Sequence, residues 1–293
     1  MTKLVSLSTI AAAMLVSSAA TPVTPSGLYR VWVSGHGTDS AGCGGPTSPC
    51  RTLQYAHDNI VLANGEIDIL DPAGYGAVTI GKALSIVNDG VGTAGVQQAN
   101  AALAGITINA GASDAIYLRG LNIDGLGTGE YGILSISGGS LAATNCVVRH
   151  FQFGIIIAPT SGATVFSLSN TNVSDNAGAG ILVYPTGSGS TKGTIIGGDV
   201  GRNGENGIEV HGNAAAGTAS FVSVSDANVS NNGSTGVLAM ADATLGITRT
   251  TATGNDLGLV VGSPATVYTY GDNRISGNAS ANVVGNLTSV SGN

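Results

Sequence analysis

The sequence has little charge and few aromatic side chains. Of its 293 residues, 9% are Asp, Glu, Lys or Arg, and 4% are Phe, Trp or Tyr. A helical bundle is excluded because leucine, glutamate and lysine do not recur in helical patterns. Disorder is excluded because 43% of this weakly charged chain is apolar. The 46 glycines, among many small and β-branched residues, indicate short strands joined by tight turns.

Basic residues are also scarce, and lysine above all. Acidic residues outnumber basic ones by 17 to 10, which gives a formal charge of −7. An acidic surface argues against nucleic acid or anionic lipid as the main partner. It also disfavours a highly anionic polysaccharide unless calcium bridges the two surfaces. We predict no cofactor and no metal site, and nothing in the sequence supports a calcium ion.

Long apolar stretches are absent except at the N-terminus. Lys3 precedes an uncharged apolar stretch over residues 4–16, and Ser18, Ala19 and Ala20 have the small side chains of a signal-peptidase site. The stretch is too short to span a bilayer, and it lacks the polar face of an amphipathic helix. We therefore predict a signal peptide over residues 1–20. The protein is then secreted, periplasmic or on the cell surface, with no membrane span.

Cysteine occurs three times. Cys43 and Cys50 enclose a short, turn-rich loop, and in an exported protein this spacing predicts a disulfide. A metal pair is the alternative, but no second pair of ligands lies nearby in the sequence. Cys146 is left over, and we interpret it as a small buried apolar residue rather than a nucleophile.

An internal repeat is the strongest signal in the sequence. Glycine followed by an apolar residue recurs every 22 to 29 residues, at Gly132-Ile133, Gly154-Ile155, Gly180-Ile181, Gly207-Ile208, Gly236-Val237 and Gly258-Leu259, and Asn282-Val283 follows with the glycine replaced. A unit of this length cannot bury its apolar face alone, but stacked units bury a continuous core. The sequence therefore predicts an all-β protein, a right-handed parallel β-helix.

A polar residue precedes each repeat marker by three or four positions. The column comprises His150, Asn176, Asn203, Asn232, Asn255 and Asn278. Asparagine tolerates left-handed turns, and stacked amides bond to one another along the axis of a solenoid. We interpret this column as a structural ladder.

The N-terminal part of the mature chain differs from the repeats. A strand over residues 29–34, the disulfide loop and a short helix over residues 52–62 predict a cap that spans residues 21–65. Strands over residues 66–70, 77–80 and 83–87 then open a β-helix that spans residues 66–293. No comparable cap follows residue 290, so we expect loops or a second subunit to cover the last coil.

One stretch carries a family resemblance. It begins at Asp71 and runs DPAGYGAVTIGKALSIV, and Asn-x-x-x-x-Gly-Ile coils follow it. Together they resemble the pectate-lyase-like β-helix superfamily, and in particular exported bacterial β-helix repeat proteins of uncharacterised function. The likeness extends from about Tyr29 to the end. It implies the fold only, because this architecture hosts lyases, hydrolases, epimerases, tailspikes and adhesins.

The superfamily's catalytic signatures are missing or misplaced. No adjacent Asp-Asp pair occurs, and Gly35-His36-Gly37 falls in the predicted cap rather than on a coil. Asp124 has no acidic partner in its motif. Asp71-Pro72 is followed by alanine, where the epimerase-like motif has histidine. The resemblance therefore transfers no catalytic residue to this chain.

Charged residues form two further columns. Arg149, Asp175, Arg202 and Asn231 precede the asparagine column by one position, and Asp226, Arg249 and Asp272 align less securely. Coils stack about 4.8 Å apart, so charges of alternating sign would form a ladder of ion pairs. A substrate groove is the alternative, with Arg149, Asp175 and Tyr184 as contacts.

Glu209 and His211 are the best acid/base pair in the chain. They lie two apart on a predicted strand, so both side chains point outward. With Arg202 and Glu205 they could form a small catalytic cluster. Such pairs are also common on solvated strand faces. The corresponding positions of other coils are apolar, among them Leu182 and Leu238, and form a strip that loops or a partner would cover.

Two functions are consistent with these features. We favour an exported, non-catalytic surface or binding module for polysaccharides or cell-surface glycans. The alternative is a carbohydrate-active enzyme, either a polysaccharide lyase or a glycoside hydrolase, with an atypical site around Arg202, Glu205, Glu209 and His211. The missing signatures and the scarcity of lysine favour the binding module. Self-association through the last coil is compatible with either function.

Overall fold

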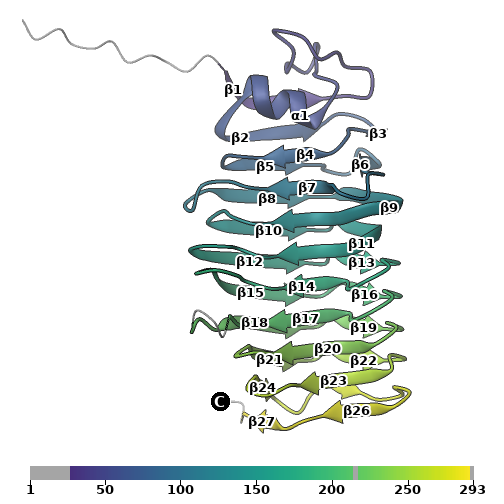
Figure 1. The fold of residues 1–293 in the computed structure, drawn as a ribbon. Coiled ribbons are helices and arrows are strands. Elements are labelled where there is room, and N and C mark those ends of the chain that lie inside the picture. The colour runs from purple at the N-terminus through teal and green to yellow at the C-terminus, as the bar shows by residue number, and fades with distance from the viewer. Residues whose placement is uncertain (1–26, 214–216, 291–293) are drawn as a thin grey trace, which may run out of the picture.

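The backbone winds into a column of stacked β-coils (Figure 1). The structure, a computed structural model, describes residues 27–213 and 217–290. Paired strands run parallel, and each pairs with the strand at the same position of the next coil. The predicted parallel β-helix is therefore confirmed. The predicted signal peptide, residues 1–20, lies outside the described residues.

Eleven strands form the first sheet, which is one long face of the column. Its order is β1 (Leu28–Val33), β2 (Val61–Ile69), β5 (Leu84–Val87), β8 (Ala115–Arg119), β10 (Ser140–Thr144), β12 (Ala163–Ser169), β15 (Ser190–Ile196), β18 (Ser220–Ser225), β21 (Thr244–Thr248), β24 (Thr266–Thr269) and β27 (Leu287–Ser289). These neighbours are in register, so each side chain has an equivalent one coil above and one below.

Sixteen strands form the second sheet, which consists of two rows. The first row comprises β3 (Ala73–Gly74), β6 (Ala94–Gln97), β13 (Asn172–Ser174), β16 (Asp199–Gly201), β19 (Asn228–Ser230), β22 (Thr251–Thr253) and β25 (Arg274–Ile275). The second comprises β4 (Val78–Ile80), β7 (Ala104–Ile108), β14 (Ile181–Val183), β17 (Ile208–His211), β20 (Thr235–Met240), β23 (Leu257–Val261) and β26 (Ala281–Val284). Two long strands, β9 (Leu121–Ser135) and β11 (Val147–Ile157), pair with both rows and join them.

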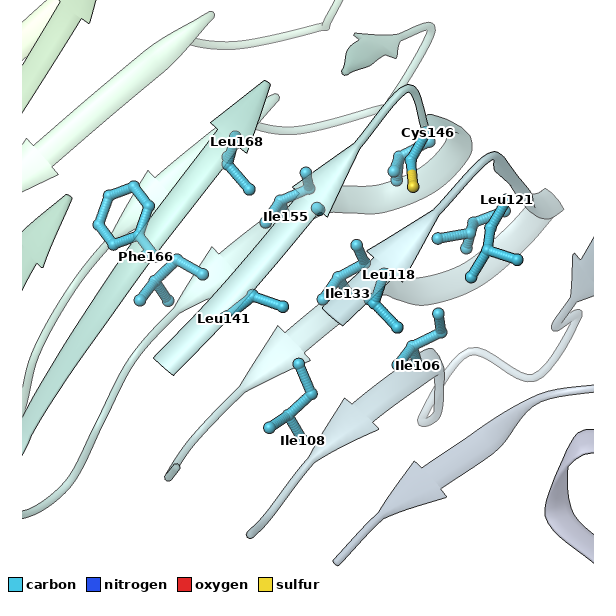
Figure 2. Close-up of a cluster of buried hydrophobic side chains, with 14 of the residues drawn as sticks. Ile106, Ile108, Leu118, Leu121, Ile133, Leu141, Cys146, Ile155, Phe166 and Leu168 are labelled. Carbon is cyan, nitrogen blue, oxygen red and sulfur yellow. The ribbon is translucent and has the colours of Figure 1, made fainter. Parts of the chain in front are cut away.

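The interior is a single hydrophobic column. Side chains alternate between the inside and the outside of each strand; in β15, Thr191, Gly193 and Ile195 are buried while Lys192 is exposed. Successive strands contribute apolar side chains at matching positions, as Figure 2 shows for Leu118 and its neighbours. The free Cys146 belongs to this core, is 1% exposed, and has its pKa raised to about 11 by burial.

The N-terminal segment closes one end of the column and also extends the first sheet, because β1 pairs with β2. The predicted disulfide between Cys43 and Cys50 is confirmed. The predicted helix over residues 52–62 is shorter: α1 (Leu53–Tyr55) continues as a π-helical turn, η1 (Ala56–Ile60). Strand β2 begins at Val61, five residues before the predicted strand, because the buried Val61 pairs with β1. The predicted boundary between cap and β-helix at residue 66 therefore falls within β2.

Asparagine side chains form a continuous hydrogen-bonded ladder at one corner. Asn176, Asn203 and Asn232 each donate from Nδ2 to Oδ1 of the asparagine in the next coil, at 2.9 Å, and Asn255 donates to Asn278 at 3.1 Å. Four of the five are nearly inaccessible to solvent. The backbone amides of the same residues donate to the same oxygens. The ladder thus satisfies buried polar groups that would otherwise be costly.

His150 does not belong to this ladder, and that prediction was wrong. Val148 pairs with Val173, so His150 aligns with Asp175, and Phe151 occupies the ladder level. The backbone amide of Phe151 donates to Oδ1 of Asn176 at 3.0 Å. The segment that leads from Val148 to the Gly-Ile marker is one residue shorter than in the next coil. An alignment that counts back from the Gly-Ile marker is therefore one residue out of register in this coil.

The same shift corrects the position of Arg149. Arg149 pairs with Ser174 rather than with Asp175. The residues that share the corner before the ladder are His150, Asp175, Arg202 and Asn231, and all four have a positive φ, between 56° and 61°. Side chains in this left-handed conformation project away from the core at the corner.

Candidate functional site

A shallow groove of about 530 Å³ runs along the outer face of the first sheet, across β10, β12, β15, β18 and β21. Its floor is one outward column of small residues, Ala142, Ser167, Thr194, Ser223 and Gly246. Because the strands are in register, the column crosses five coils without interruption. The floor therefore offers hydroxyl groups and open space in a straight row.

A second outward column forms one side of this groove. Val165, Lys192 and Phe221 are aligned across three adjacent strands. Val165 and Phe221 are each 51% exposed, although both are large apolar side chains. Lys192 is exposed and forms no hydrogen bond or ion pair with the rest of the described chain. Apolar surface beside a free ammonium group and hydroxyls is typical of a binding surface.

The predicted acid/base pair lies on the other sheet, on β17. Nε2 of His211 is 2.5 Å from Oε1 of Glu209, and Nδ2 of Asn206 donates to Oε2 of Glu209 at 2.7 Å. Burial raises the pKa of Glu209, but the hydrogen bonds from His211 and Asn206 outweigh it and leave the pKa below its ordinary value. Glu209 is therefore a carboxylate held by two donors.

Tyr184 lies beside this pair. Its ring meets the ring of His211 edge to face, with the centroids 5.0 Å apart. Both rings line a pocket of about 340 Å³ at the end of β14 and β17, together with Pro185 and Thr186. Tyr184 is 47% exposed, so about half of its surface is open to solvent.

The other two members of the predicted cluster do not join the pair. Nε and Nη2 of Arg202 donate to the two carboxylate oxygens of Asp175, at 2.8 and 2.9 Å. The side chain of Glu205 is exposed and has no hydrogen-bond partner in the described part of the chain. Of the four candidates, the structure brings together only Glu209 and His211.

The remaining charged candidates form ion pairs between coils. Asp124 accepts from Arg149 and His150, each at 3.0 Å, and from the amide of Leu126. Burial raises the pKa of Asp124, but these bonds outweigh it and the pKa is lowered. Arg249 is likewise bidentate to Asp226. The exposed Arg249–Asp226 pair is screened by solvent and contributes little to stability, so it mainly fixes the register.

The described residues include neither a cluster of metal ligands nor a helix that could span a membrane. Residues 27–213 and 217–290 contain no group of three or more His, Cys, Asp or Glu side chains that could hold a metal ion. The same part of the chain contains no helix with the length and apolar character needed to cross a membrane.

The repeat pattern of the sequence does not predict the groove. Phe221, Val165 and Lys192 lie on strands that lack the Gly-Ile marker, so they were not aligned with one another. The alternation of polar and apolar residues in β18 would have indicated that Phe221 replaces a polar residue at an outward position.

Comparisons with known proteins agree on the class of protein. The family model described as "right handed beta helix region" matches residues 153–293. The chain therefore has the fold of a right-handed parallel β-helix, as the sequence predicts. A similar solved structure is "Crystal structure of pectate lyase Pel9A", with a TM-score of 0.60 and 16% sequence identity over 90% of this chain and 80% of that chain. At this identity the likeness concerns the fold alone. No curated protein sequence matches the chain.

Proposed function

We propose that the protein is an exported glycan-binding module that holds a polysaccharide chain in the groove of the first sheet. The observation that carries this proposal is Phe221, a half-exposed aromatic ring beside a row of hydroxyl-bearing and small residues. Sugar rings combine an apolar face with peripheral hydroxyls. An aromatic ring binds the former, and serine, threonine and lysine side chains bind the latter.

The geometry of the groove supports a polymer rather than a compact ligand. The floor repeats once per coil along the axis, so a linear chain that lies across the strands meets similar contacts at each step. The groove is open and shallow, which suits an extended chain with two free ends. Lys192 adds a donor for a hydroxyl or an acidic substituent.

The residues that line the groove support binding without turnover. They include no Asp or Glu, so the groove contains no pair of carboxylates for a glycoside hydrolase. Since no cofactor is predicted, we also expect binding to be unaffected by a chelator of divalent cations. A dependence on calcium would contradict this part of the proposal.

Binding to a panel of neutral and acidic polysaccharides, measured by affinity electrophoresis, tests the proposal. The variant Phe221→Ala should weaken binding about tenfold, equivalent to roughly 1.4 kcal/mol. Tyr29→Ala, which removes another exposed aromatic ring on β1 far from the groove, should leave binding unchanged. Equal binding by the wild type and Phe221→Ala would exclude the groove as the polysaccharide-binding site. Release of new reducing ends by the wild type would instead favour the carbohydrate-active alternative.

We also propose export of the mature protein. The Cys43–Cys50 disulfide supports this, because disulfides persist in oxidising compartments. Mass spectrometry of the protein recovered outside the cytoplasm should give a mature N-terminus near residue 21. An intact N-terminus in a cytoplasmic fraction would contradict export.

A final proposal concerns self-association through the last coil. Within the described residues, β26 and β27 each pair on one side only, and Val283 and Val284 are 39% and 41% exposed. A second copy could pair with these edges. Sedimentation should detect a dimer that Val284→Lys disrupts, and a monomer at all concentrations would refute this proposal.

A further inference from the structure

An isolated polar pair interrupts an apolar row on the outer face of the second sheet. In register with Glu209 are Leu182 on one side and Leu238 on the other, and His211 is paired with Met240. The side chains of Glu209 and His211 are only 18% and 17% exposed. Partial burial of a carboxylate and an imidazole costs desolvation energy, and apolar residues would fill these positions more favourably. The pair belongs to no ladder along the axis, so stacking of the coils does not require it.

The pair is also held in one orientation by a chain of hydrogen bonds. The backbone amide of Thr235 donates to Oδ1 of Asn206 at 3.0 Å, and Nδ2 of Asn206 donates to one oxygen of Glu209. The other oxygen of Glu209 faces Nε2 of His211. A carboxylate accepts, so Nε2 carries the proton, and Nδ1 of a neutral His211 remains as a hydrogen-bond acceptor.

Within the described part of the chain, Nδ1 of His211 has no hydrogen-bond partner, so it is the ring nitrogen that a ligand can reach. That pocket, of about 340 Å³, is lined by His211, Tyr184, Pro185 and Thr186 among others. Its volume lies at the small end of the range for ligand sites. It offers an aromatic surface on Tyr184, a hydroxyl on Thr186 and a fixed acceptor on His211.

We propose that this pocket is a second binding site, which takes a single sugar ring. The apolar face of the ring packs on Tyr184, and one hydroxyl group donates to Nδ1 of His211. Glu209 and Asn206 are positioning residues that fix the tautomer and the orientation of His211. The site is separate from the groove, because β14 and β17 belong to the second sheet. It would recognise a terminal sugar or a side branch, whereas the groove takes an extended chain.

Titration calorimetry of the full chain with the methyl glycosides of glucose, galactose, mannose and N-acetylglucosamine tests this site. We expect at least one glycoside to bind with a Kd near 1 mM, as befits a single small ring. Tyr184→Ala should weaken that binding at least tenfold and leave the fold intact, because Tyr184 is half exposed. Tyr270→Ala, which removes a tyrosine that is 53% exposed elsewhere, should bind as the wild type does.

Nitrogen-15 NMR of the histidine ring distinguishes binding from a purely structural role of Glu209 and His211, because a structural role predicts no change of the ring signals on addition of ligand. The ligand should shift the Nδ1 resonance of His211 while Nε2 stays protonated. In Glu209→Gln, the free protein should populate both neutral tautomers and bind the glycoside several-fold more weakly. Absence of binding by all four glycosides, or binding that Tyr184→Ala and Glu209→Gln leave unchanged, would overturn the proposal.

Discussion

At the scale of single residues, the corner asparagines contribute more to the stability of the fold than their number suggests. Each of the buried amides Asn203, Asn232 and Asn255 bonds to a neighbour in both directions, and its Nδ2 also reaches a backbone carbonyl. Removing one side chain therefore breaks several bonds and leaves donors of the preceding coil without an acceptor. An unsatisfied buried group costs about 1–3 kcal/mol, so the loss exceeds that of an ordinary surface hydrogen bond.

Asn232→Ala should accordingly lower the free energy of unfolding by roughly 2–4 kcal/mol, because Asn203 loses the acceptor for both its side-chain and its backbone amide. Urea denaturation followed by circular dichroism measures this change. Asn228→Ala is the matched control, since Asn228 lies outside the core and bonds to Asp199 at the surface; it should cost less than 1 kcal/mol. Equal effects of the two substitutions would refute a structural role for the ladder.

At the scale of strands and coils, packing against the next coil decides which residues are allowed. Phe166 is a large buried side chain in the middle of the first sheet and is 2% exposed. Its ring occupies the space above Gly193 on the adjacent strand, where a Cβ atom would lie 2.3 Å from the ring. Phe166 and Gly193 therefore form a large–small pair across the two strands.

Gly193→Ala should destabilise the protein by about 1–3 kcal/mol, because a buried ring must move to admit one methyl group. Gly246→Ala is the control on the same sheet: its Cβ would point outward and meet only Oγ of Ser223, at 4.0 Å. The thermal unfolding midpoint of that variant should lie within about 1 °C of the wild-type value. Thermal denaturation of both variants checks the pair, and an unaffected Gly193→Ala would contradict this packing.

The elements also show what the sequence could and could not predict. The repeat of Gly-Ile markers predicts the coils, because stacking in register requires the same residue type at the same corner. The alignment fails at His150 and Arg149, because the segment between the strand and the marker is one residue shorter in this coil. The sequence gives no sign of that missing residue. The Glu209–His211 pair was predictable, since both lie on one strand. The partners of Arg202, however, depend on a corner conformation that spacing does not encode.

At the scale of the whole molecule, the pH dependence of stability follows from carboxylates whose ionised form is stabilised by hydrogen bonds and ion pairs in the folded state. Asp175, bonded to Arg202, has a lowered pKa, as do Asp124 and Glu209, where hydrogen bonds outweigh burial. Unfolded Asp and Glu titrate near 3.9 and 4.3. A folded pKa below these values adds stability at higher pH, which is lost as the pH falls through the folded pKa. Glu66 acts in the opposite sense, because burial and Asp68 raise its pKa.

We therefore expect full stability at pH 7, the first loss of stability below about pH 5, and a steep loss towards pH 3. Thermal midpoints at pH 7, 5 and 3 measure this, and Glu209→Gln should show a smaller decrease between pH 5 and 3 than the wild type. A midpoint that does not change between pH 7 and 3 would mean that the lowered pKa values do not contribute to stability.

The asparagine ladder has a consequence for how such a protein changes over evolutionary time. Successive steps of the ladder span 27, 29, 23 and 23 residues, yet the side-chain hydrogen bonds stay between 2.9 and 3.1 Å. The loops can therefore differ in length from coil to coil. The core, in contrast, can gain or lose residues only as complete coils. Deleting residues 203–231 would bring Asn232 to the position of Asn203 and restore every step. Of all insertions and deletions, this architecture should therefore tolerate the duplication and the loss of entire coils best.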